Sequence, residues 1–187
     1  MPTKLARRQL LLGLSTIALV GSGRPGAAAS ASQVPVHPLA ERLAAYAADL
    51  RFDDIDPVTL ETVKSHVIDT LGCALGAFDE EPVRICREIA LVPGGGTSTI
   101  IGTGKRSTPD FAAFANTAAS RYFDLNDTYA GTDNTHPSDT IPACFAVAEF
   151  AQASGSELAV AIVLAYEITC RLADAIPVAD RGWDSSI

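Results

Sequence analysis

One polar stretch in the middle of the chain, residues 124–139, gathers the side chains best suited to acid–base chemistry. It carries carboxylates, one imidazole and several hydroxyl groups: Asp124, Asp127, Asp133, Asp139, His136, Thr128, Thr135 and Ser138. An imidazole titrates near neutral pH, so His136 can take a proton from a substrate or return one, and a carboxylate beside it can share that work. The same residue types are common in turns and helix caps, which leaves a structural interpretation open. A single histidine among scattered carboxylates lacks the spacing of a metal site, and we expect none.

Helices on both sides are expected to hold this stretch in place. Apolar residues recur at helical spacing in the segments 39–50, 57–76, 81–88, 108–122, 140–152 and 156–173. Prolines directly follow candidate N-cap residues at Asp56 and Thr108, as at many helix starts. Only residues 97–102 read as β-like. The chain is therefore predicted to be mostly α, Ala-rich, with at most one short β element.

Several polar residues have expected roles around these helices. If a helix begins at Thr140, Ser138 or Asp139 is expected to cap it, and its free N–H groups can receive a carboxylate ligand. His66 is expected to be a surface or structural histidine, and Arg171 to pair with a glutamate four residues earlier. The cations available for a substrate carboxylate lie outside the polar stretch: Lys64, Lys105, Arg106, Arg121 and Arg171.

Residues 1–31 have the composition of an export signal. Arg7 and Arg8 precede an apolar run at 10–20, and small residues follow up to Ala31. The paired arginines are typical of twin-arginine export, which predicts a periplasmic or otherwise exported protein with no membrane segment after signal removal. A general secretory signal with a chance arginine pair and an uncleaved anchor remain alternatives, although the run is shorter than the roughly 20 residues a spanning helix needs.

Composition narrows the classes of partner. The chain has 187 residues, a net charge of -8 and 48 % hydrophobic residues. This acidic balance argues against a nucleic-acid partner, because phosphate contacts need clustered lysine and arginine. The length suits one domain or part of a larger one. The four cysteines fall within apolar helical patterns, so buried free thiols are expected.

Two strings within the polar stretch resemble the signature of the MmgE/PrpD family: Asp124-Leu125-Asn126-Asp127-Thr128 and His136-Pro137-Ser138-Asp139. Further similar segments lie at 64–73, 101–104, 166–172 and 182–184. The family includes 2-methylcitrate dehydratase, cis-aconitate decarboxylase and an iminodisuccinate epimerase. The similarity extends over nearly all of residues 39–187.

The resemblance implies a large helical domain and a second α+β domain that closes over the site. It also implies a small polycarboxylate as the substrate, no cofactor, no metal, and a homodimer for the full-length protein. Matched motif to motif, Asp124 and His136 would be the catalytic residues. Thr128 and Ser138 would bind the substrate.

Proteins of the family are more than twice as long as this chain. Residues 32–187 are therefore expected to be an incomplete N-terminal portion of the helical domain. A lysine and a tyrosine of the family pocket would lie beyond Ile187. Three functions stay open: a lyase that dehydrates or decarboxylates its substrate, an epimerase or isomerase using the same proton abstraction, and a truncated helical fragment that is inactive or binds a partner.

Overall fold

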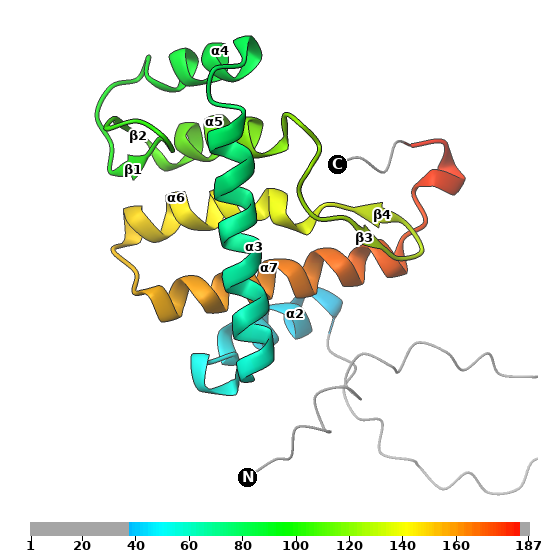
Figure 1. Cartoon of the computed structure of the whole chain (residues 1–187). Coiled ribbons are helices and arrows are strands. Elements are labelled where there is room, and N and C mark those ends of the chain that lie inside the picture. The colour runs from blue at the N-terminus through cyan, green and yellow to red at the C-terminus, as the bar shows by residue number, and fades with distance from the viewer. Residues whose placement is uncertain (1–37, 184–187) are drawn as a thin grey trace, which may run out of the picture. The chain divides into compact units, whose positions relative to one another are not determined.

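A computed structural model describes residues 38–183, and the predicted signal at 1–31 lies outside them. The compact unit begins at Leu39. Its helices are α2 (Leu39–Asp49), α3 (Pro57–Gly76), α4 (Glu81–Ala90), α5 (Pro109–Arg121), α6 (Ile141–Ala151) and α7 (Gly155–Ala175) (Figure 1). Short 3-10 turns lie at η1 (Phe52–Asp54), η2 (Pro137–Thr140) and η3 (Ala179–Arg181). The mostly-α prediction is confirmed, and each predicted helix lies within a few residues of an observed one.

Two short antiparallel strand pairs accompany the helices. β1 (Ser98–Thr99) pairs with β2 (Arg106–Ser107), and β3 (Tyr129–Ala130) pairs with β4 (Asn134–Thr135). Strand β1 lies within residues 97–102, the segment predicted to be β-like. The second pair corrects the expectation of at most one β element, because it lies within the stretch expected to be a loop. Strands of two residues are too short to show an alternating pattern in the sequence.

Helix α5 lies at the centre of the helical packing. It contacts α3, α4 and α6, and α6 in turn contacts α7. In Figure 1, α3 runs across α5, α6 and α7. Small side chains fill the contacts, with Ala74, Ala77 and Ala119 packed around Val83. Because helix separation depends on the side chains at the contact, alanines let these helices approach closely.

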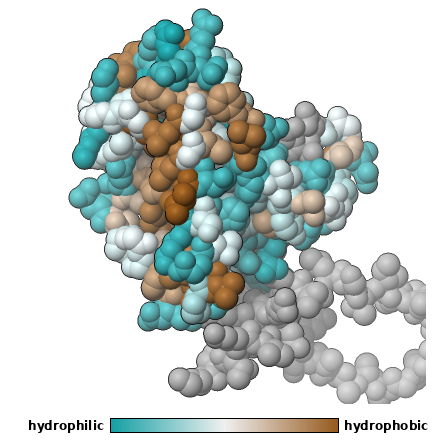
Figure 2. Space-filling model, in the orientation of Figure 1, coloured by the Kyte–Doolittle hydropathy of each residue, from teal (hydrophilic) through white to brown (hydrophobic). Residues whose placement is uncertain are grey.

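The apolar surface is not fully covered. Figure 2 shows hydrophobic residues gathered in a band along the visible face of α3. Ile68 and Leu75 belong to α3 and are 71 % and 52 % exposed. None of the described helices has the length and apolar character needed to cross a membrane.

Helix α3 begins as predicted. Asp56 is its N-cap, and its Oδ1 accepts the backbone N–H groups of Val58 and Thr59, at 3.0 Å each. Helix α7 begins at Gly155, because Ser154 and Glu157 form a reciprocal capping box across its first turn. The start predicted at Ser156 is therefore late.

Thr108 is the N-cap of α5, as predicted, although its side chain makes no capping hydrogen bond. The predicted cap of α6 is wrong. Neither Ser138 nor Asp139 caps α6, because both lie within η2 and Thr140 occupies the cap position. The side chains of Ser138 and Asp139 instead bind Asn126, which draws them away from the start of α6.

Candidate active site

Asn126 joins the two halves of the polar stretch. Its side chain is almost completely buried, and its Nδ2 donates to Ser138 Oγ at 2.8 Å and to Asp139 Oδ1 at 2.9 Å. Its Oδ1 accepts a hydrogen bond from Arg121 at 3.2 Å. Residues on either side of the β3–β4 hairpin are thereby held together in one place.

Asp127 forms a second link and sets the tautomer of His136. The Asp127 carbonyl oxygen lies 2.7 Å from His136 Nδ1, and its Oδ1 accepts the backbone N–H of Ser138 at 3.1 Å. A carbonyl oxygen can only accept, so Nδ1 carries the proton and Nε2 holds the lone pair in the neutral ring. The Thr128 hydroxyl lies 3.4 Å from the same Nδ1. His136 is thus oriented to act as a base through Nε2.

Asp124 lies near this imidazole but is held by another residue. Its backbone is left-handed (φ 53°), a conformation that aspartate tolerates better than most residues. Its exposed carboxylate is paired with the Arg121 guanidinium. That hydrogen bond, more than the charge of His136, lowers the pKa of Asp124. The structure therefore brings Asp124 and His136 to the same region without a direct hydrogen bond between them.

Arg121 is the cation of this cluster, and carboxylates already surround it. Besides Asp124, its Nε lies 3.6 Å from Asp139 Oδ2. Burial raises the pKa of Asp139, while the hydrogen bond from Asn126 and the charge of Arg121 oppose that rise. The guanidinium is therefore shared among protein groups before any substrate arrives.

A cavity of about 390 Å³ lies between α3 and α7. Val63 and His66 line it from α3, Ile162 and Tyr166 line it from α7, and Tyr129 lines it from β3. None of the four sequence-predicted site residues is part of this lining. The cavity is connected to these residues through the sequence, because Tyr129, which lines the cavity, directly follows Thr128.

His66 and Tyr166 join the cavity to Asp127. His66 Nδ1 lies 3.8 Å from Asp127 Oδ2, and the rings of His66 and Tyr166 are 5.1 Å apart between centroids. The buried Tyr166 hydroxyl has no partner in hydrogen-bond geometry among the described residues. Burial, together with the nearby Asp127 carboxylate, nevertheless raises the pKa of Tyr166. The phenol stays protonated and keeps a donor to offer.

These two residues were missed as site residues in the sequence. His66 was expected to be structural, and Tyr166 stood out only as part of a family-like segment. Thr59, Thr62, Val63 and His66 share one face of α3 at helical spacing, which is the signal that was available. The helix facing them comes from far along the chain, and no local pattern indicates it.

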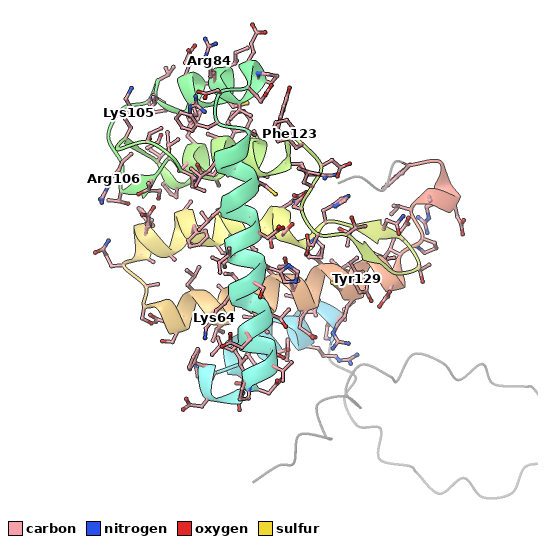
Figure 3. All side chains as sticks on the ribbon, viewed as in Figure 1. Lys64, Arg84, Lys105, Arg106, Phe123 and Tyr129 are labelled. Carbon is pink, nitrogen blue, oxygen red and sulfur yellow. The ribbon has the colours of Figure 1, made fainter. Side chains whose placement is uncertain are left out.

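Asp133 has a structural position. Its almost buried Oδ2 accepts the backbone N–H groups of Val178 and Ala179 after α7, the latter at 3.1 Å. The Tyr129 hydroxyl donates to Asp174 Oδ2 at 2.9 Å, also at the end of α7. In Figure 3, Tyr129 lies between the β3–β4 hairpin and α7. These bonds fasten the hairpin to the helix, and with it both flanking halves of the site.

Two further predictions can be compared with the structure. Arg171 pairs with Glu167, its Nε and Nη2 lying 2.8 and 2.6 Å from Oε2, as predicted. The four cysteines are free but only partly buried. Within residues 38–183, no group of three or more metal-ligating side chains is placed to hold an ion.

Known proteins resemble this chain over most of its described length. Residues 41–187 match the MmgE/PrpD N-terminal domain. The 2-methylcitrate dehydratase of Salmonella typhi is 31 % identical over 108 residues, which are 54 % of this chain and 21 % of that protein. The probable 2-methylcitrate dehydratase of Saccharomyces cerevisiae is 33 % identical over 96 residues, 49 % of this chain and 18 % of that protein.

A third relative matches over a longer segment. The cis-aconitate decarboxylase-like protein oryM of Aspergillus oryzae is 28 % identical over 148 residues, which are 73 % of this chain and 31 % of that protein. The matched segments thus span between 18 % and 31 % of the length of these curated relatives.

Proposed function

Because the chain belongs to the MmgE/PrpD family, we propose that it functions as a metal-independent lyase that acts on a small di- or tricarboxylate such as 2-methylcitrate. The observation that supports this most is His136, whose Nδ1 is engaged by the Asp127 carbonyl while Nε2 is left to accept a proton. A base of this kind is what removal of a proton beside a carboxylate requires.

In the proposed dehydration, His136 Nε2 takes the proton from the carbon next to a substrate carboxylate. The electron pair of that C–H bond becomes the second bond of the alkene, and the C–O bond to the neighbouring hydroxyl breaks. The hydroxyl leaves with a proton from an acid and departs as water. Asp124 orients the substrate or relays a proton, and Thr128 donates a hydrogen bond to it.

Ser138, also predicted to bind substrate, is completely buried, and its Oγ accepts from Asn126. We therefore propose that Ser138 acts by holding Asn126 rather than by touching the substrate. Charge that develops on the substrate carboxylate needs additional donors, since Arg121 is already shared between carboxylates. We propose that, in the relatives, these additional donors come from the parts of the chain outside the matched segment.

Partners and location are further proposals. We propose a homodimer for the full-length protein, supported by the exposed apolar side chains of Ile68 and Leu75 on α3. Export through a signal at residues 1–31 stays a prediction of the sequence.

The test is turnover across a panel of 2-methylcitrate, citrate and cis-aconitate. A dehydratase forms a conjugated alkene that absorbs in the ultraviolet, and a decarboxylase releases carbon dioxide. His136→Gln should abolish either signal, whereas Asp79→Asn, in an exposed turn, should not. Absence of turnover with every acid would instead favour the inactive or binding-module alternative.

An epimerase or isomerase is the second candidate function, and one observation favours it. Two imidazoles contact Asp127, His136 at its carbonyl oxygen and His66 at its carboxylate, which supports a site with two bases. Deuterium incorporation with inversion, and without an alkene product, would select this function.

A further inference from the structure

His66 lies on α3, outside the polar stretch that holds His136, yet it has a partner within that stretch. Its Nδ1 is 3.8 Å from Asp127 Oδ2. This separation is longer than a hydrogen bond, so the contact is electrostatic. Because a carboxylate attracts the proton of a ring nitrogen that faces it, Nδ1 of His66 carries the proton when the ring is neutral. The imidazole of His66 therefore turns its N–H edge toward Asp127.

The rings of His66 and Tyr166 lie against each other, which keeps the imidazole beside Asp127. Their centroids are 5.1 Å apart, and their planes are inclined by 36°. Tyr166 belongs to α7, and Figure 1 shows α3 crossing that helix. The Asp127 side chain is 14 % exposed, so water and salt have little access to its carboxylate and screen the attraction to His66 weakly. The contact thus has more effect here than on an open surface.

Asp127 transmits this contact to His136. Its Oδ1 accepts the backbone N–H of Ser138, and its Oδ2 faces His66. Both carboxylate oxygens are therefore engaged, which restricts rotation of the side chain and of the main chain that bears it. The carbonyl oxygen of that main chain lies 2.7 Å from His136 Nδ1. Because the hydrogen bond at one ring nitrogen determines which nitrogen is protonated, the direction of this carbonyl decides the tautomer of His136.

We propose that His66 is a positioning residue for the base. Through the Asp127 carboxylate it keeps the Asp127 carbonyl directed at His136 Nδ1, and the lone pair of His136 therefore stays on Nε2. The inference rests on the proposed function, in which His136 Nε2 takes the substrate proton. It adds a residue that acts without touching the substrate, unlike the second base of an epimerase. Without His66, part of the His136 population would carry its proton on Nε2, where it cannot accept another.

The test is NMR of the full chain with isotope-labelled histidine, because the chemical shift of a ring nitrogen distinguishes a protonated atom from one with a lone pair. The chain has three histidines, and His136→Gln identifies the signals of His136 by their loss. Spectra are recorded without substrate at the alkaline end of a pH titration, where imidazole rings are neutral. Wild type should show His136 protonated at Nδ1 and unprotonated at Nε2. The opposite tautomer in wild type would overturn the proposal before any variant is made.

Two replacements of His66 separate the effect of its polar nitrogen from that of its volume. His66→Leu removes the donor and should give His136 a mixture of both tautomers. His66→Asn places an amide N–H near the position of Nδ1 and should restore the wild-type signals. Ser65→Leu, at the exposed neighbouring position of α3, is the control and should leave those signals unchanged. Circular dichroism verifies folding. Wild-type signals in His66→Leu, or equal mixtures in both replacements of His66, would contradict the proposal.

Kinetics with 2-methylcitrate adds a second reading. His66→Leu should lower kcat about 10–100-fold, the range found when the outer hydrogen-bond partner of a metal-bound histidine is removed. KM should stay unchanged, because His66 does not touch the substrate. A loss of turnover in His66→Leu without any change in the tautomer of His136 would mean that His66 acts directly, and would overturn the positioning role.

The spectra need no substrate, so the inference and the proposed function can fail separately. The expected tautomers in wild type and in the variants, with no turnover of any acid, would leave the role of His66 standing and remove the lyase. Turnover that disappears in His136→Gln, together with wild-type signals in His66→Leu, would do the reverse.

Discussion

The Nδ1 atom of His136 lies 2.7 Å from the main-chain carbonyl oxygen of Asp127, across the β3–β4 hairpin. The same aspartate faces His66 with its carboxylate, so one residue touches both imidazoles of the region. Its carbonyl selects the tautomer of His136, and its side chain links that histidine to the cavity between α3 and α7. The function of the site therefore depends on the backbone of this hairpin as well as on its side chains.

Replacing Asn126 with alanine should destabilise the fold. The change removes the hydrogen bonds of Asn126 to Ser138, Asp139 and Arg121, and it leaves the buried Ser138 hydroxyl unpaired, which costs about 1–3 kcal/mol. Urea unfolding should show a lower midpoint with an unchanged slope. Asn134→Ala, at an exposed position of β4, is the matched control. Equal stability of the two variants would mean that Asn126 does not hold the halves together.

Asp124→Asn should reduce turnover by about a hundredfold or more if the carboxylate takes part in proton transfer. Its pair with Arg121 is exposed, and such pairs contribute little to stability, so the unfolding midpoint should scarcely change. Steady-state kinetics beside Asp79→Asn gives the comparison. Full activity of Asp124→Asn would assign the carboxylate to structure alone.

The N-cap of α3 should make stability depend on pH in acid. Hydrogen bonds from the backbone and hydroxyl of Thr59 lower the pKa of Asp56 below its ordinary 3.8. A lowered pKa in the folded state stabilises the fold above the unfolded value, and this contribution is lost as pH falls through the folded value. Asp56→Asn keeps a good cap but cannot titrate.

Above about pH 4, the thermal unfolding midpoint of wild type should therefore be higher than that of Asp56→Asn. The difference between the two midpoints should shrink as the solution becomes more acidic. Thermal unfolding followed at several pH values measures this. A difference that does not vary with pH would show that the charge of Asp56 makes no contribution.

Gly131→Ala should loosen the hairpin from α7. A Cβ at this position would lie 2.3 Å from Asp174 Oδ1 and 2.8 Å from the Tyr129 ring, both too close. The exposed Asp174 side chain must turn away to make room, which costs its hydrogen bond from Tyr129, a bond worth about 0.5–1.5 kcal/mol. Gly104→Ala, which meets nothing within 4 Å, is the control. The hydrogen-exchange rate of the hairpin amides should rise only in Gly131→Ala. A faster exchange in Gly104→Ala than in Gly131→Ala would contradict the attachment of the hairpin to α7.

The sequence predicts the helices well because their signals are local. Asp56 caps α3 with its own neighbours, and the apolar spacing of α5 and α6 lies within each helix. The candidate site is predicted only in part. The two motif strings indicate which stretch holds the site, but they do not predict the hydrogen bonds of Asn126 to Ser138 and Asp139. The pairing of Arg121 with Asp124 depends on a left-handed backbone that no spacing reveals.

The cavity shows the same limit more strongly. His66 and Tyr166 meet because α3 crosses α7, and nothing in either segment indicates the other. Asp133 looked like one more candidate carboxylate, yet it binds backbone N–H groups beyond α7. Contacts between distant segments decide which polar residues serve chemistry and which serve the fold.

The most direct test of the central claim is the rate at which the protein exchanges the substrate proton next to the carboxylate with deuterium from solvent, followed by proton NMR on 2-methylcitrate. Dehydration and epimerisation both begin with removal of this proton. If His136 is the base, wild type and Asp79→Asn should exchange the proton, and His136→Gln should be slower by about 10²–10⁴-fold. Exchange by His136→Gln at the rate of wild type would contradict the account.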